Sequence, residues 1–429
     1  MSRGKAEMTT GTTEQVGQVG KVGQAAPAAA ETGDRLEPLV FALTGEEAEL
    51  VSAASSVVPV LSANAEKADA TRRLPGEDIA ALRAAGLFRL STPREYGGYE
   101  AGARAVTAIA AELGRGCGSV GWVLAVYYAA GIGARMFPDK VQDRVWGKDP
   151  DATVCGSSAG AVSAQPVDGG YLLSGRWGWA SGALHASWAI LDIVVGGEGP
   201  SPDRGIALVA MDELSIEDTW HMAGMRGTGS ETIAAESLFV PQEQVLLRSR
   251  MAGGPTAERR TGAPVRVPTP DALMGALAGP VLGMGMALYD HVVAKLTDGR
   301  PLVSAARLHA RAVDAPGVQA NVADAAMLID SAILQAARSA RAVDQAVAAG
   351  TRLPPLTAAR IRMDAGFAAR QIRRAADKLL DVGGAGRFAE SSPAQRIWRD
   401  LGTATRHPAF VTEIDRERYA RLLLGLDGK

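Results

Sequence analysis

The stretch "LRAAGLFRLSTPREYGG" (Leu82–Gly98) decides the first part of the fold. It begins with alanines and leucines at helical spacing and then meets breaks at Thr92–Pro93 and Gly97–Gly98. Proline lacks a backbone donor and glycine permits turns, so a helix ends here and a loop follows. Outward from this stretch, the helical period extends from about Thr44 to Lys148. We therefore expect an N-terminal helical domain.

Two further zones follow along the chain. From Ala152 to about Leu247, short β-rich runs are bounded by Gly, Pro, Asp and Ser, which indicates a small, mostly antiparallel β-domain. From Pro270 to about Leu424 the helical period returns, in segments long enough for a bundle. The expected helices are Gly45–Lys67, Pro75–Ala85, Ala272–Lys295, Val318–Ala349 and Leu356–Val382, with stops at Gly350 and Gly383–Gly384, and the expected strands are Tyr171–Leu173, Trp188–Val195 and Ile206–Met211.

The predicted domains are a disordered N-terminal tail at 1–35, an N-terminal helical domain at 36–150, a middle β-domain at 151–250, a linker at 251–269 and a C-terminal helical bundle at 270–429. The tail is expected because its Gly, Thr, Ala and Val residues lack an apolar core, which also excludes a secretory signal. The order helical, β, helical makes the fold class α+β.

Composition and charge exclude several functions. The 429 residues carry a net charge of −2, which supplies no basic field for nucleic acid or an anionic membrane. No uninterrupted apolar run reaches the roughly 18 residues of a membrane-spanning helix, and Trp122–Met136 is interpreted as a buried helix. We expect a cytoplasmic protein. Cys117 and Cys155 are expected to be reduced core thiols, and the scattered histidines have no metal-binding spacing.

Several segments together resemble the acyl-CoA dehydrogenase superfamily. They are the opening stretch, "AELGRGCGSVGW" (Ala111–Trp122), "GRWGWASG" (Gly175–Gly182), "GMRGTGSETIAAESLFVP" (Gly224–Pro241) and "GVQANVADA" (Gly317–Ala325). The resemblance covers about Leu36 to Leu424. It implies an N-terminal helical domain, a middle antiparallel β-domain and a C-terminal four-helix bundle, with flavin held between them. It also implies a homotetramer.

Two branches of this superfamily use flavin differently. Dehydrogenases use oxidised flavin and a carboxylate base that removes the proton next to an acyl thioester. Two-component monooxygenases take reduced flavin, FMN or FAD, from a separate reductase and form a flavin hydroperoxide with O2. They then hydroxylate aromatic rings, amines or sulfur heterocycles.

The segment "QRIWRDLGTATRHPAF" (Gln395–Phe410) favours the monooxygenase branch. Typical dehydrogenases carry the catalytic glutamate eight residues after the Asp of an Arg-Asp pair, and that count from Asp400 reaches Pro408, which accepts no proton. His407 precedes it, where the monooxygenase branch often has a histidine. The resemblance thus implies a hydroxylase of an aromatic, polycyclic or amine small molecule in secondary metabolism. The alternatives are an acyl thioester dehydrogenase with Asp271 as its base, and a catalytically silent scaffold.

The resemblance also implies roles for individual residues. Trp179 matches the aromatic that walls the flavin, and Ser181 matches the hydroxyl that bonds the central-ring nitrogen. Alternatively, Trp177, Trp179 and Ser181 mark a strand with one buried face. His407 is the acid/base candidate and a substrate contact, since a histidine pKa near 6.5 suits either role. It would otherwise cap a helix or contact its neighbours.

Further candidates carry two interpretations each. Ser157 and Ser158, the latter a catalytic candidate, face flavin or substrate in related monooxygenases, and a small-residue turn explains them equally. Arg226 in "GMRGTGS" supports a turn or touches flavin. Gly383 and Gly384 in "VGGAG" lie near a neighbouring subunit's cofactor in the family, or end a helix.

Substrate contacts are expected from the helix after "GW". Many aromatic hydroxylases of this branch place a phenol-binding histidine there, and our count puts Ala130 at that position, after Tyr127 and Tyr128. We therefore assign the two tyrosines to the substrate site and expect a substrate bulkier than a simple phenol. The small residues Gly131 and Gly133 would open space for it, or permit close helix packing.

Overall fold

The described chain consists of N-terminal helices, a β-sheet in the middle of the sequence and C-terminal helices. The computed structural model describes residues 41–158, 160, 162–196, 203–251, 274–298 and 308–426. The helices are α2 (Glu46–Thr71), α3 (Gly76–Ala84), α4 (Ala103–Gly116), α5 (Gly118–Ala134), α6 (Asp139–Trp146), α7 (Arg248–Met251), α9 (Ala278–Thr297), α10 (Pro316–Ala349), α11 (Pro355–Gly383), α12 (Pro393–Ala404) and α13 (Glu413–Leu423). The predicted tail, nearly all of the predicted linker and Asp271 lie outside the described residues.

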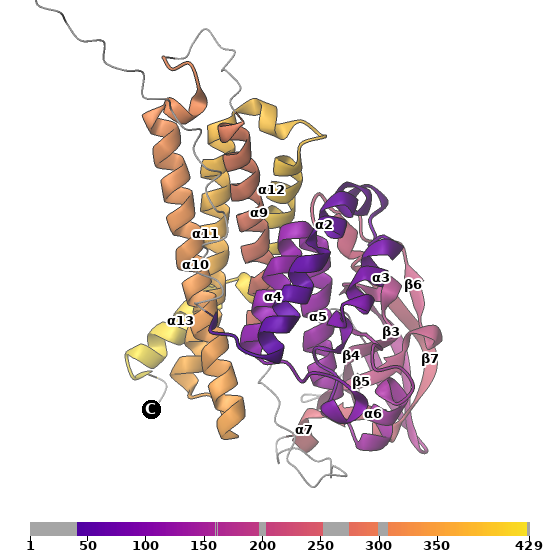
Figure 1. Cartoon of the computed structure of the whole chain (residues 1–429). Coiled ribbons are helices and arrows are strands. Elements are labelled where there is room, and N and C mark those ends of the chain that lie inside the picture. Colours follow the sequence, from indigo (N-terminus) through magenta and orange to yellow (C-terminus); the bar gives the residue numbers. More distant parts are fainter. Residues whose placement is uncertain are drawn as a thin grey trace, which may run out of the picture. The chain divides into compact units, whose positions relative to one another are not determined.

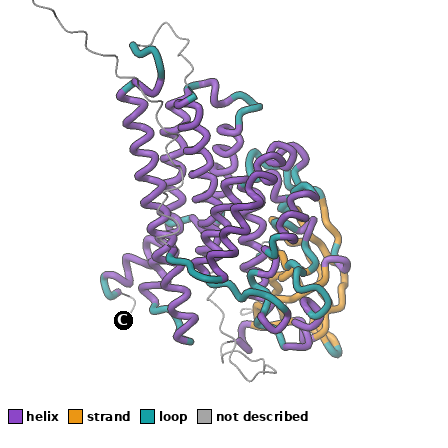
Figure 2. The backbone as a smooth tube through the Cα atoms, in the orientation of Figure 1, coloured by secondary structure: helices purple, strands orange, loops and turns teal. Residues whose placement is uncertain are grey.

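The strands form one sheet in the order β6-β7-β3-β2-β4-β5-β8, and β1 pairs with β4. They are β1 (Val154–Ser157), β2 (Val162–Val167), β3 (Gly170–Ala180), β4 (Trp188–Val195), β5 (Asp203–Ala210), β6 (Ser215–Glu217), β7 (Glu231–Pro241) and β8 (Val245–Leu247). The pairings are antiparallel, except that β1 and β2 run parallel to β4. Figure 2 shows the strands gathered in one region, with helices making up the rest. The predicted α+β class is confirmed.

Helices α4 and α5 lie between the sheet and the long C-terminal helices (Figure 1). Helix α5 packs against both α9 and β1, and most of its side chains are buried, as predicted for this apolar stretch. Glycine permits the close approach of α4 to α9, because a Cβ on Gly283 would lie 2.0 Å from the carbonyl oxygen of Ala111. This packing joins the N-terminal helices to the bundle.

The long helices α9, α10, α11 and α12 share an alanine-rich apolar core. Two of them end where the sequence predicted. Helix α10 stops at Gly350, with φ of 64°, and α11 stops at Gly384, with φ of 62°. A positive φ is easily adopted only by glycine, so these residues end the helices.

Two helices are long and apolar enough to cross a membrane by composition alone, α2 and the helix Gly275–Thr297. Within the protein, 72% of the apolar window of the second helix is buried, and 28% of that of α2. Helix α2 carries Glu46, Glu47 and Glu49 in its first turn. The cytoplasmic location stays a prediction.

Candidate active site

Residues from three parts of the chain meet around the indole of Trp122 in α5. Its Nε1 donates a hydrogen bond of 3.3 Å to Oγ of Ser181, which follows β3. Its ring meets the ring of His407 edge-on, with centroids 5.2 Å apart and planes at 75°. Trp122 and Ser181 are both buried. The predicted site residues Ser181 and His407 therefore contact the same side chain, which the sequence interpretation did not include in the site.

His407 lies between α12 and the 3-10 turn Pro408–Phe410, and its imidazole caps that turn. Nδ1 accepts a hydrogen bond of 3.2 Å from the backbone N–H of Ala409. Burial lowers the pKa of His407 to about 4. The ring is therefore neutral at pH 7, and since Nδ1 accepts, the ring proton belongs on Nε2. The capping alternative is confirmed, and the same cap makes Nε2 a hydrogen-bond donor.

Trp179 stands on a bulge of β3. The register of β3 against β7 shifts between Trp177 and Ala180, and Trp179 has a φ of 60°. Trp177 is fully buried, whereas Trp179 is 65% exposed. The alternative of a strand with one buried face is therefore wrong here, because the bulge turns Trp179 outward. A bulky residue with positive φ is strained, and such strain is concentrated at functional sites.

The end of β1 lies beside this bulge. Ser157 Oγ donates a hydrogen bond of 2.5 Å to the carbonyl of Gly178, the residue before Trp179. Ser158 follows β1 and is exposed. The structure thus brings Ser157 next to the strand that carries Trp179. Contacts of Ser157 and Ser158 with flavin or substrate stay predictions.

A chain of buried hydroxyls runs from Ser181 into the loop after β6. Ser181 Oγ lies 2.8 Å from Ser230 Oγ, which lies 2.7 Å from Thr228 Oγ1. Thr228 Oγ1 donates a bond of 2.8 Å to the carbonyl of Met225. The Gly182 N–H also donates to the Thr228 carbonyl, at 2.9 Å. The loop "GMRGTGS" is therefore tied to the site through its backbone and its side chains.

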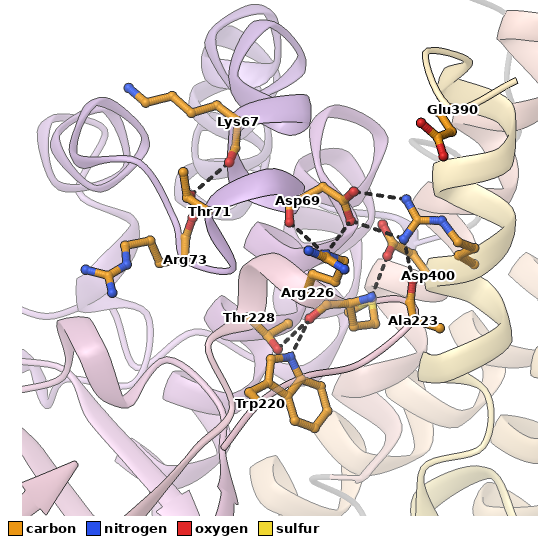
Figure 3. Close-up of polar contacts among 12 residues, drawn as sticks. Lys67, Asp69, Thr71, Arg73, Trp220, Ala223, Arg226, Thr228, Glu390 and Asp400 are labelled. Carbon is orange, nitrogen blue, oxygen red and sulfur yellow. Dashed lines mark hydrogen bonds and ion pairs between the residues drawn. The ribbon is translucent and has the colours of Figure 1, made fainter. Parts of the chain in front are cut away.

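Arg226 supports this loop. Its Nε donates a bond of 2.9 Å to the carbonyl of Asp69 in α2 and lies 3.7 Å from the Asp69 carboxylate. Figure 3 shows Arg226 pointing toward Asp69. Arg399 of α12 binds the same carboxylate at 2.9 Å. Of the two interpretations of Arg226, these contacts favour support of the turn, and its contact with flavin stays a prediction.

Asp400 holds the start of the "GMRGTGS" loop. Its carboxylate accepts the backbone N–H of Met225. Burial raises the pKa of Asp400 to about 7. Helix α12 therefore fixes both the start of the loop, through Asp400, and the position of His407 after its last turn.

The two tyrosines assigned to substrate lie in the core. The Tyr127 hydroxyl donates to the Gly182 carbonyl at 2.6 Å, and the Tyr128 hydroxyl donates to the Ala101 carbonyl at 2.9 Å. Both side chains are buried, which raises the pKa of both hydroxyls. Because these hydroxyls are satisfied by backbone, the contacts give a substrate role no support.

The glycines that follow serve close packing. A Cβ on Gly131 would lie 2.1 Å from Ser91 Oγ, and one on Gly133 would lie 2.8 Å from Ile190 Cδ1. Neighbouring atoms thus occupy the space at these two positions. The packing alternative is confirmed for both.

Four other predicted residues have structural roles. Gly383 is the last residue of α11 and Gly384 its cap, so the helix stop is confirmed, while their contact with a neighbouring subunit's cofactor stays a prediction. Burial raises the pKa of the Cys117 and Cys155 thiols to about 12, so both stay protonated at pH 7. They are free, buried core residues, as expected.

Known proteins resemble this chain over most of its length. It is 32% identical over 356 residues to "Flavin-dependent monooxygenase, oxygenase subunit HsaA" of Rhodococcus jostii (strain RHA1), which covers 82% of this chain and 92% of that protein. Residues 44–137 match the family "Acyl-CoA dehydrogenase, N-terminal domain", and residues 276–412 match "Acyl-CoA dehydrogenase, C-terminal domain". The chain is a flavin-dependent monooxygenase of the acyl-CoA dehydrogenase superfamily.

Two further relatives agree with this assignment. The monooxygenase is 31% identical over 400 residues to "FADH(2)-dependent resorcinol hydroxylase, oxygenase component" of Rhizobium sp. (strain MTP-10005), covering 90% of this chain and 97% of that one. The solved structure "XiaF from Streptomyces sp. in complex with FADH2 and Glycerol" has 34% identity and a TM-score of 0.82, and the match covers 89% of this chain and 96% of that chain. The predicted superfamily, branch and fold are confirmed.

Proposed function

We propose that this monooxygenase takes reduced FMN or FAD from a separate reductase and uses O2 to hydroxylate an aromatic or polycyclic small molecule of secondary metabolism. The observation that carries the proposal is the shared indole of Trp122, which contacts both Ser181 and a neutral His407. The printed names of the relatives support it, since one is an FADH2-dependent oxygenase component and another was solved with FADH2.

Trp179 and Ser181 suit a flavin ring. Trp179 offers an exposed indole on a bulge of β3, and stacking on such an indole suits a flat, polarisable ring. The buried Ser181 hydroxyl, two residues further along the chain, offers a polar contact. When bound, reduced flavin supplies two electrons, so that one atom of O2 enters the substrate and the other leaves as water. Gly383 and Gly384 of a neighbouring subunit would complete the site.

His407 would act as a hydrogen-bond donor rather than as a base. Its Nδ1 is occupied by the Ala409 N–H, and its ring is neutral at pH 7. A neutral ring with Nε2–H donates to a substrate oxygen but accepts no proton at that nitrogen. Of the roles predicted for His407, substrate positioning is therefore the one that the geometry favours.

Two small residues bear on the choice of substrate. By our count Ala130 stands at the position of the family's phenol-binding histidine, and it faces Gly156 of β1, since a Cβ on Gly156 would lie 3.6 Å from the Ala130 Cβ. Neither residue offers a polar group for a phenol. We therefore favour a polycyclic aromatic over a simple phenol.

We also propose that the enzyme is a homotetramer in the cytoplasm. Large apolar side chains are exposed on the C-terminal helices, where a monomer would leave them in water. They include Met327 and Leu334 of α10, Phe367 of α11, Trp398 of α12 and Ile414 of α13. Subunit contacts over these helices would cover them.

The test is single-turnover product analysis. The purified protein is mixed anaerobically with reduced FMN or FAD, then with O2 and a panel of phenols and polycyclic aromatics, and products are measured by mass spectrometry. Hydroxylated product that carries ¹⁸O from ¹⁸O2 supports the proposal. Oxidation of an acyl thioester by the oxidised-flavin form, without any hydroxylation, would contradict it.

A further inference from the structure

The hydrogen-bonded chain Ser181–Ser230–Thr228 has a fixed donor-to-acceptor direction, which follows from the groups at its two ends. At the inner end lies the Met225 carbonyl, which accepts from Thr228 Oγ1 at 2.8 Å and from Trp220 Nε1 at 2.9 Å. Figure 3 shows the Thr228 and Trp220 side chains pointing at this one carbonyl. A carbonyl oxygen only accepts, so the single Thr228 hydrogen lies on this contact.

The donor and acceptor roles of Ser230 and Ser181 then follow from that of Thr228. The hydroxyl hydrogen of Thr228 is used in its bond to Met225, so in the contact of 2.7 Å Ser230 donates to Thr228. The hydroxyl hydrogen of Ser230 is then used in turn, so in the contact of 2.8 Å Ser181 donates to Ser230. All three hydroxyls are buried, so water does not compete for these contacts.

The outer end agrees with this direction. Trp122 Nε1 lies 3.3 Å from Ser181 Oγ, and an indole N–H is a donor only. Ser181 therefore donates inward to Ser230, accepts from Trp122 and keeps one lone pair. Toward a ligand it offers an acceptor and no hydrogen.

We propose that Thr228 and Ser230 are positioning residues that hold the Ser181 hydroxyl as an acceptor, so that the site selects reduced flavin over oxidised flavin. The inference rests on the proposed flavin site. The central-ring nitrogen N5 carries a hydrogen in reduced flavin and only a lone pair in oxidised flavin. A fixed acceptor bonds the first and opposes the second.

The experiment compares the affinities of both redox forms. Oxidised FMN and FAD, and the same flavins reduced with dithionite under anaerobic conditions, are titrated into wild type and Thr228→Val by equilibrium dialysis. Valine has nearly the shape of threonine but no hydroxyl to accept from Ser230. Ser230 can then donate to Ser181, and Ser181 can donate to a ligand. We expect the ratio of the oxidised to the reduced Kd to fall roughly fivefold, the worth of about one hydrogen bond.

Controls separate direction from packing. Thr228→Ser keeps the hydroxyl and should retain the wild-type ratio. Thr107→Val removes an equally buried hydroxyl, which donates to the Ala103 carbonyl in α4, and should also leave the ratio unchanged. If Thr228→Val does not fold, Ser230→Ala breaks the same chain and is expected to lower the ratio in the same way.

The affinities of wild type and variants separate failure of the proposed donor direction from failure of the proposed function. A wild-type preference for reduced flavin that persists in Thr228→Val and Ser230→Ala would overturn the direction proposed for Ser181 but leave the proposed function standing. Failure of the wild type to bind either flavin would overturn the proposed function itself. Loss of the preference in both variants, with normal thermal unfolding, supports the proposal.

Discussion

At the scale of single residues, His407 links the chemistry of the site to its acid stability. Its pKa is lowered to about 4 by burial, against about 6.5 when unfolded. Above pH 6.5 both states are neutral and the shift has no effect. Below pH 6.5 the unfolded state takes up a proton first, so stability is lost progressively as the pH falls toward 4.

The corresponding prediction concerns His407→Gln. Between pH 7.5 and pH 5, wild type should lose about 2 kcal/mol more of its unfolding free energy than the variant, because only wild type carries this histidine. Urea unfolding at the two pH values measures the difference. Equal losses would mean that the imidazole is already exposed in the folded protein.

Ser181 is expected to control how well flavin oxidation is coupled to hydroxylation. Ser181→Ala should still oxidise reduced flavin but release more H2O2, with hydroxylated product per flavin down roughly tenfold, the effect of losing one or two bonds. Product and peroxide are measured together in single turnovers. Unchanged coupling would mean that Ser181 takes no part in the reaction. Ser163→Ala, in β2, is the control and should leave the coupling unchanged.

Residue identities alone predicted part of this site. Ser181 and His407 were selected because each stands in a motif, and the structure places both against Trp122. Trp122 itself was not selected, since its contacts depend on α5 lying beside both residues. The outward turn of Trp179 also escaped prediction, because the alternating pattern of β3 gives no sign of a bulge. The burial of Tyr127 and Tyr128 was not predicted, because aromatic residues suit a core as well as a pocket, and their substrate role stays a prediction.

At the scale of elements, α12 positions the site by direct backbone contact. A Cβ on Gly224 would lie 2.1 Å from the carbonyl oxygen of Arg399 in α12. The loop that carries Thr228 and Ser230 starts at this contact. Only a residue without a side chain lets the loop approach the helix so closely.

Gly224→Ala should therefore push the loop away from α12. We expect a loss of about 2–3 kcal/mol in unfolding free energy, the usual cost of overpacking, together with weaker binding of reduced flavin. Chemical unfolding and flavin titration measure the two effects. Gly317→Ala in α10 is the matched control, since a Cβ there meets nothing within 4 Å, and it should be neutral or slightly stabilising.

Element positions were more predictable than element contacts. Helices α10 and α11 end at the predicted glycines because positive φ is a local requirement. Strand β3 is longer than the predicted Tyr171–Leu173, since its second half is rich in Gly and Trp and is stabilised by pairing with β7. Such pairing partners lie far away in sequence, and a local pattern does not contain them.

At the scale of the whole molecule, the proposed assembly makes a prediction about the C-terminal helices. Ile414 of α13 and Met327 of α10 are exposed apolar residues on the proposed contact surface. Ile414→Glu combined with Met327→Glu should place charges in that contact and shift the protein to smaller species in size-exclusion chromatography with light scattering. The folded helical signal should persist.

Phe239→Glu provides the comparison, because Phe239 is an exposed apolar residue of β7 in the sheet. It should leave the oligomeric state unchanged. A wild-type protein that is monomeric at micromolar concentration would remove the proposed tetramer, and with it the role of Gly383 and Gly384 across subunits.

The indole of Trp122 has a consequence for the evolution of new activities. Ser181 and His407 belong to a strand end and a bundle turn, yet each contacts this one ring. Substitutions at the two positions are thus energetically coupled, and their effects will not add. Libraries that vary Ser181, His407 and Trp122 together are therefore expected to contain active combinations that libraries of single positions miss.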